Sequence, residues 1–121
     1  MIQKKILFIS RHAPYGSSLA KDCIDALLAA SAYNQILSLL FLDDGVFQLL
    51  KKQEAKEIQQ KNFSSMLPAL ELYDIERIYV LKDDLTSRGI TPEDFSCINI
   101  KLLSHQEVQE LIQQQDQLLS F

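Results

Sequence analysis

The chain has 121 residues, of which 47% are hydrophobic and 23% are charged, and its net charge is -4. This length and composition predict one globular domain, residues 1–121, with enough apolar side chains for a core. There is no stripe of lysine and arginine of the kind that a nucleic-acid binder needs, so direct contact with DNA or RNA is disfavoured.

The first ten residues have a short basic start followed by an apolar run. That run is too short for a signal-peptide core and far too short to span a membrane. The two cysteines, Cys23 and Cys97, occur in unrelated contexts. A disulfide framework is therefore not expected, and a reducing, cytoplasmic location is favoured.

The first third of the chain predicts a strand, a helix and a second strand. Residues 6–10 are a continuous apolar run, which is typical of a parallel strand covered on both faces. Ser17 or Ser18 can cap a helix over residues 19–30, where apolar side chains recur at helical spacing. Residues 36–42 form the next apolar run and predict the second strand.

The second strand leads into Asp43, Asp44 and Gly45, residue types that end strands and form turns. Gly45 can adopt backbone angles that other residues avoid, which allows a sharp turn. Residues 46–50 are too apolar for a solvated loop. They are expected either to fold back on the core or to be covered by another protein, and the sequence leaves these alternatives even.

The middle of the chain predicts one exposed connection and three further elements. Residues 51–62 are polar and predict an exposed segment, and residues 63–72 predict a helix that contains Pro68. The apolar run 77–81 predicts the third strand. Asp83 can cap a short helix, which Gly89 would close in the left-handed conformation.

The last quarter predicts two helix starts and two strands. Residues 91–94 begin a helix with a proline in its first turn. Residues 97–101 predict the fourth strand and residues 117–121 the fifth. Between them, Ser104 and Glu107 form a capping box. The buried stripe of that last helix is Val108, Leu111 and Ile112.

Strands and helices alternate along the whole chain, and this order predicts an α/β fold. The expected architecture is a single-domain three-layer sandwich, in which a five-stranded, mostly parallel sheet has helices on both faces. Five strands fit the flavodoxin-like order 2-1-3-4-5 better than the full dinucleotide-binding fold.

The motifs that hold common cofactors are missing. The sequence has no GxGxxG, no GxxxxGK[ST] and no Cys/His cluster with metal-ligand spacing, so no cofactor and no metal is predicted. A flavodoxin-type ligand module is an alternative, but the first loop lacks a Ser/Thr run to cradle phosphate. His12 could act at the end of the first strand, although a solvent or interface position is favoured, and His105 is expected at the surface.

For the remaining reactive side chains a structural role is favoured over a chemical one. Asp43 and Asp44 could bind a cation or act as bases, but ending a strand and bonding turn amides is favoured. Cys23 lies on the apolar face of the first helix, where burial makes a thiol a poor nucleophile. Cys97 begins an apolar strand. Structural packing is favoured for both cysteines over a role as a sulfur carrier.

Three parts of the sequence resemble a known family. They are the loop 13–16, the segment DGVFQLL at 44–50, and the stretch LYDIE at 72–76 with Arg88-Gly89 beyond it. Together they are similar to the DsrE/DsrF-like sulfurtransferase family, and most of all to its TusC (DsrF) subunit. The resemblance runs from the first strand to Phe121.

The resemblance implies a subunit that assembles with TusB-like and TusD-like partners as a heterohexamer. Such a complex relays persulfide sulfur from a TusA-like donor towards a TusE-like acceptor, and the sulfur ends in the 2-thio group of the tRNA wobble uridine. The related DsrEFH assembly works in sulfur oxidation, which is the alternative pathway.

The family's sulfur-carrying cysteine lies at the end of the third strand, close to Leu81 here, and no cysteine is present there. Persulfide relay needs a thiolate. The chain is therefore expected to be a non-catalytic, structural subunit, and whether it is an enzyme by itself stays open. A core role remains the alternative for the residues expected at its interface, which are Tyr15, Val46, Phe47, Leu49, Leu50 and Tyr73.

Overall fold

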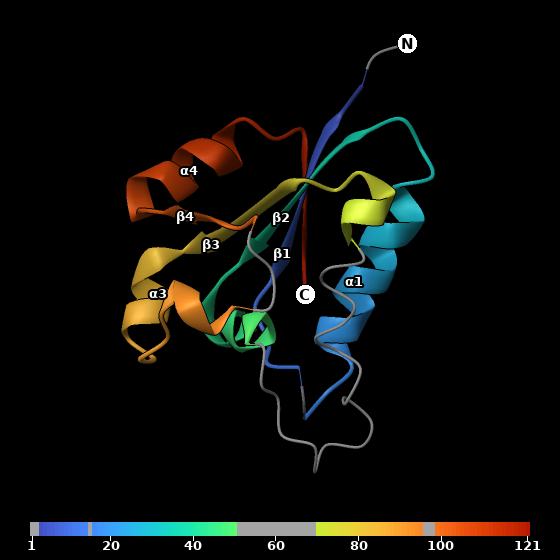
Figure 1. Cartoon of the computed structure of the whole chain (residues 1–121). Helices are drawn as coiled ribbons and strands as arrows, with labels where there is room; N and C mark the ends of the chain where they lie inside the picture. Colours follow the sequence, from blue (N-terminus) through green and yellow to red (C-terminus); the bar gives the residue numbers. More distant parts are fainter. Residues whose placement is uncertain (1–2, 15, 51–69, 96–98) are drawn as a thin grey trace.

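The computed structural model describes residues 3–14, 16–50, 70–95 and 99–121, and Figure 1 shows the chain. The strands are β1 (Lys5–Ser10), β2 (Ile36–Phe41), β3 (Arg77–Leu81), β4 (Lys101–Leu103) and β5 (Gln117–Ser120). The α-helices are α1 (Leu19–Ala30), α3 (Lys82–Thr86) and α4 (His105–Gln113). Short 3₁₀ helices are η1 (Asp43–Leu49), η3 (Leu70–Tyr73) and η4 (Pro92–Asp94).

The five strands form one parallel sheet with a hydrophobic layer on each face. Successive side chains of a strand point to opposite faces. Phe8 therefore packs in the layer under α1, which includes Ile24, whereas Leu7 packs in the layer under α4, which includes Val108. Figure 1 shows α1 and α4 on opposite sides of the strands. The predicted α/β fold, with helices on both faces of a parallel sheet, is confirmed.

The strand order corrects one part of the prediction. The sheet runs β4-β3-β2-β1-β5, not 2-1-3-4-5. Strands β2, β3 and β4 each add on the same side of β1, and the chain then crosses back so that β5 pairs with the other side of β1. Because parallel crossovers are right-handed, the early connections lie on the α1 face and the return through α4 lies on the other.

Most strand boundaries agree with those predicted from the sequence, but those of β4 do not. The fourth strand was expected over 97–101, but β4 is Lys101–Leu103 and pairs with the end of β3, from Tyr79 to Leu81. Residues 99 and 100 precede it without strand structure, and 96–98 lie outside the described residues. The predictions for 51–62 and most of 63–72 also fall outside them, while the end of the latter forms η3.

The ends of α3 and α4 are set by residues close to them in the sequence. The Ser104 hydroxyl accepts a hydrogen bond from the Glu107 N–H at 3.2 Å, and the Glu107 carboxylate accepts one from the Ser104 N–H at 2.9 Å, which confirms the predicted capping box. The Ser104 N–H, and to a smaller extent the Ser104 side chain, lower the pKa of Glu107 by hydrogen bonding to its carboxylate. Gly89, at φ +68°, has the left-handed conformation predicted after α3. Asp83 is inside α3, because the N-cap position belongs to Leu81.

Candidate functional site

The carboxyl ends of β1, β2 and β3 lie side by side because these strands are parallel neighbours. The segments that leave β2 and β3 are η1 and α3, which pack against one another. After β3 the chain turns towards the α1 face, and after β4 it turns towards the α4 face. This reversal is a topological switch point, where open α/β sheets place their binding sites.

Gly45 allows η1 to lie against the end of β1. A Cβ atom at Gly45 would overlap the carbonyl oxygen of Ser10 and lie 2.8 Å from its carbonyl carbon. The requirement for glycine is therefore one of space, and the expected unusual backbone angle belongs instead to Asp43, at φ 51°. The Asp43 N–H donates to the Asp84 carboxylate at 2.6 Å, which holds this turn in place.

Gln48 is the polar side chain inside this contact. It is fully buried, and its Nε2 donates to the Ser10 hydroxyl at 2.7 Å and to the His12 carbonyl at 2.8 Å. These bonds fasten η1 to the end of β1 and to the loop beyond it. Sequence reasoning missed Gln48, although a single amide inside the run Val46–Leu50 was a signal of a buried side chain that hydrogen-bonds within the chain.

The apolar segment after β2 divides between core and surface. Val46 and Leu49 are fully buried within the chain, so the core alternative holds for them and they present no surface to a partner. Phe47 and Leu50 are half-buried and pack on the edge of the same core. Phe47 and Leu50 are therefore the side chains of Val46–Leu50 that reach the surface.

The other expected anchors lie elsewhere. Tyr73 is 52% exposed and follows Leu72, which is 84% exposed and was not singled out from the sequence. Both precede β3, so they are at the amino end of the sheet, opposite η1. Tyr15 lies outside the described residues. The six expected residues therefore do not form one continuous patch.

Two arginines bind the carboxylates at the strand ends. Arg11 pairs with Asp43 at 3.0 Å. Arg88, after α3, pairs with Asp44 at 3.1 Å and lies 3.7 Å from Asp84. The expectation that Asp43 and Asp44 bond turn amides is thus replaced by ion pairs, and the turn amide is bound by Asp84. The side chains of Arg11 and Asp43 are half-exposed, and such pairs contribute little to stability.

The histidines do not form a catalytic cluster. His12 is exposed, and its backbone carbonyl rather than its ring contacts Gln48. The His105 ring lies 3.0 Å from Asp83 at the surface, which joins α3 to the start of α4. Among the described residues no group of His, Cys, Asp and Glu could hold a metal ion. None of the described helices is long and apolar enough to cross a bilayer.

Cys23 is held in a form that is poor for sulfur chemistry. Its side chain is fully buried in the layer under α1. Burial raises the pKa of the thiol to about 12, although a hydrogen bond with the Ser10 side chain opposes the shift. A thiol with this pKa is almost entirely protonated near neutral pH, so it is a weak nucleophile.

Alkylation of Cys23 is expected to be slow in the folded protein. In a Cys97→Ser variant Cys23 is the only cysteine, and its pKa rises from 9.0 to about 12 on folding. Each pKa unit lowers the thiolate fraction about tenfold, so iodoacetamide at pH 8 should react on the order of 1000-fold more slowly than in urea-unfolded chain. Mass spectrometry over time measures this, and rapid native labelling would contradict it.

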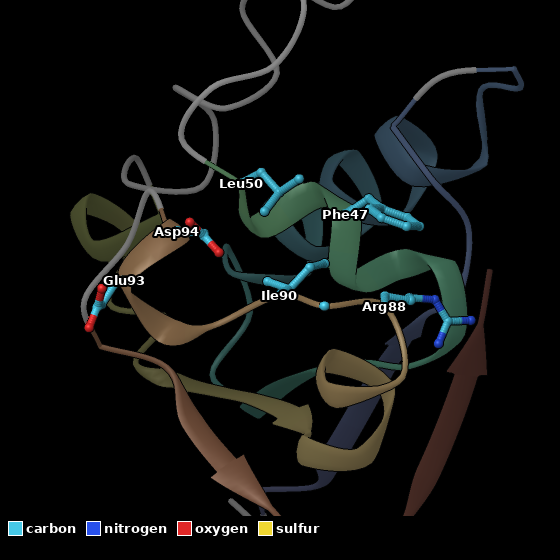
Figure 2. Close-up of a pocket in the computed structure, with 7 residues that line it drawn as sticks. Phe47, Leu50, Arg88, Ile90, Glu93 and Asp94 are labelled. Atoms are coloured by element: carbon cyan, nitrogen blue, oxygen red, sulfur yellow. The ribbon is translucent and has the colours of Figure 1, made fainter.

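A groove lies between η1 and η4 (Figure 2), with a volume of about 500 Å³. We call it the η1–η4 groove, and its lining includes Phe47, Leu50, Arg88, Ile90, Glu93 and Asp94. The backbones of Leu50 and Phe95 form an antiparallel bridge, which ties its two walls together. The half-buried apolar side chains of η1 thus lie beside charged groups.

The comparison with known proteins assigns the family. Residues 4–121 match the DsrE/DsrF-like family. The chain belongs to this family. It is 41% identical over 117 residues to a protein of Vibrio parahaemolyticus named "Protein TusC homolog", covering 97% of this chain and 98% of that protein. This confirms the resemblance that the segments 44–50 and 72–76 indicated.

A second curated protein and a solved structure are also similar to this chain. The chain is 35% identical over 133 residues to the "Intracellular sulfur oxidation protein DsrF" of Allochromatium vinosum, covering 99% of this chain and 98% of that protein. The crystal structure of the ychN protein from E. coli has a TM-score of 0.81 at 24% identity and covers 99% of this chain and all of that one. The comparison with the ychN protein shows that the two chains share a fold.

The position at the end of β3 has no reactive group in this family member. Leu81 is buried and packs with Leu7 and Leu40 in the layer under α4. The charged side chains Lys82, Asp83 and Asp84 follow it at the start of α3. A persulfide cannot form on any of these side chains.

Proposed function

We propose that this chain is a non-catalytic subunit of a cytoplasmic sulfur-relay complex. It assembles with TusB-like and TusD-like chains as a heterohexamer, and a partner subunit carries the reactive cysteine. The observation that supports this most is the chemistry of the described residues: Leu81 stands where the resemblance places the sulfur carrier, and Cys23 is buried with a pKa of about 12.

In this proposal the sulfur transfer takes place on a cysteine of the partner subunit. A cysteine thiolate attacks the outer sulfur of a donor persulfide, a new S–S bond forms, and the donor cysteine leaves as a thiolate. Sulfur then passes from a TusA-like donor towards a TusE-like acceptor and to the wobble uridine of tRNA. The role of this chain is to shape and hold the complex.

Co-purification of the tagged chain from its native cells tests the proposal. Mass spectrometry under non-reducing conditions should find two chains of similar size in the complex, with the persulfide on one of them. Recovery of the chain alone, with a persulfide on Cys97 or Cys23, would make it the sulfur carrier. Cys97 lies outside the described residues, so this experiment decides its role.

The interface is expected to include Phe47 and Leu50. Phe47→Asp combined with Leu50→Asp should weaken partner binding about tenfold or more, since buried apolar anchors dominate interfaces. Sizing chromatography of the co-expressed complex measures it, with thermal unfolding as the check on folding. Because both side chains also touch the core, exposed Tyr73→Ala tests the opposite end of the sheet without that complication, and an intact complex in both variants would refute these anchors.

A role in sulfur oxidation is the second candidate, because the relative from Allochromatium vinosum is named for that process. The two pathways use the same kind of subunit. Deletion of the gene distinguishes them: loss of 2-thiouridine from tRNA supports the first, and loss of sulfur oxidation with normal tRNA supports the second.

A further inference from the structure

The η1–η4 groove combines an apolar floor with an acidic end. Phe47 lies on η1 and Leu50 directly follows it, and Ile90 lies below both, with Asp94 to one side of it and Arg88 to the other (Figure 2). In the same view, Glu93 and Asp94 lie at one end of the groove and Arg88 lies at the other, with its guanidinium turned away from them. The two ends therefore differ in charge.

The positive charge of Arg88 is already balanced by the chain itself. Its guanidinium binds Asp44 at 3.1 Å and approaches Asp84 at 3.7 Å, and its side chain is only 24% exposed. Glu93 and Asp94, at the other end of the groove, form no ion pair with a described residue, so Arg88 does not offset their charge. Among the described residues this end of the groove is therefore acidic, which favours a cationic group.

The two acids at the acidic end of the groove, Glu93 and Asp94, differ in their hydrogen bonds. Asp94 accepts hydrogen bonds from the Thr91 N–H at 3.0 Å and the Thr91 hydroxyl at 3.2 Å, which complete the cap of η4. Glu93 is exposed, and its carboxylate has no ion pair or side-chain hydrogen bond with any other residue that the structure describes. Within the described part of the chain, the charge of Glu93 is therefore not neutralised.

We propose that the η1–η4 groove receives a basic side chain, lysine or arginine, from a partner subunit of the complex. Its aliphatic stem lies on Phe47, Leu50 and Ile90, and its cationic end reaches Glu93 and Asp94. Long basic side chains bury their stems on apolar surface while the charge meets a carboxylate. This inference rests on the proposed function, and it adds the chemistry of the contact.

The test is partner binding by the full chain with Glu93→Lys, which reverses the free charge. The co-expressed partners should bind at least tenfold more weakly, and Glu93→Gln should bind several-fold more weakly with a smaller loss of affinity on raising salt. Glu110→Lys is the matched control, because Glu110 is an exposed acid on α4, across the sheet. It should change the affinity less than twofold.

The outcomes separate the two proposals. If the unaltered chain binds no partner, the proposed function fails. If it binds and Glu93→Lys binds as well as Glu110→Lys does, only the groove inference fails. If Glu93→Lys disrupts self-association of this chain and not partner binding, the occupant is a second copy, which also overturns it. Restoration of Glu93→Lys binding by one Lys→Glu or Arg→Glu change in a partner would support it.

Discussion

Gly45→Ala should destabilise the folded chain by about 3 kcal/mol, at the upper end of the usual cost of overpacking. The added methyl group would overlap the backbone carbonyl of Ser10 and come within 3.3 Å of the Arg11 Cα. Backbone atoms in a parallel strand cannot move aside as a flexible side chain can. Either β1 shifts against β2, or η1 lifts away from the end of β1. Urea unfolding followed by circular dichroism measures the change.

Gly16→Ala is the control for this prediction. Gly16 has φ +91°, and a Cβ atom there would meet nothing within 4 Å. Its substitution should cost about 1 kcal/mol, which reflects only the disfavoured backbone conformation. If Gly45→Ala were no more destabilising than Gly16→Ala, the close contact between η1 and β1 would not be as the structure has it.

Gln48→Leu should also destabilise the fold by about 3 kcal/mol, although the new side chain is apolar and of similar size. The change removes the two hydrogen bonds that Gln48 donates and leaves the Ser10 hydroxyl and His12 carbonyl without that donor. A buried hydrogen bond contributes about 1 kcal/mol net, and a polar group left unsatisfied costs about 1–3 kcal/mol. Urea unfolding measures this effect too.

An exposed glutamine on α4 gives the comparison. Gln109→Leu makes the same chemical change at the surface and should alter stability by less than about 0.5 kcal/mol. Equal effects at Gln48 and Gln109 would show that the buried bonds contribute nothing. Gln48 also fixes the segment that carries Phe47 and Leu50. Its substitution should therefore reduce partner binding, and the amount of bound partner should fall together with the folded fraction of the chain.

Local pattern was sufficient for most elements of this fold. Apolar runs marked β1, β2 and β3, and the spacing of apolar side chains marked α1, because these signals depend only on neighbouring residues. The cap at Ser104 was visible because its two partners are three residues apart. The fourth strand was predicted too early in the chain. β4 begins where its backbone can pair with β3, and the apolar residues 97–101 do not by themselves indicate that pairing.

The apolar runs and the three family segments were enough to identify a parallel α/β chain of the DsrE/DsrF-like family, whose third strand ends on Leu81 and not on a cysteine. The strand order could be seen only in the folded chain, since alternating strands and helices do not say on which side of β1 each new strand adds. The tertiary structure also decided which half of DGVFQLL is core. Val46 and Leu49 face the sheet, whereas Phe47 and Leu50 reach the groove, because Gly45 and Gln48 fix the rotation of η1 against Ser10.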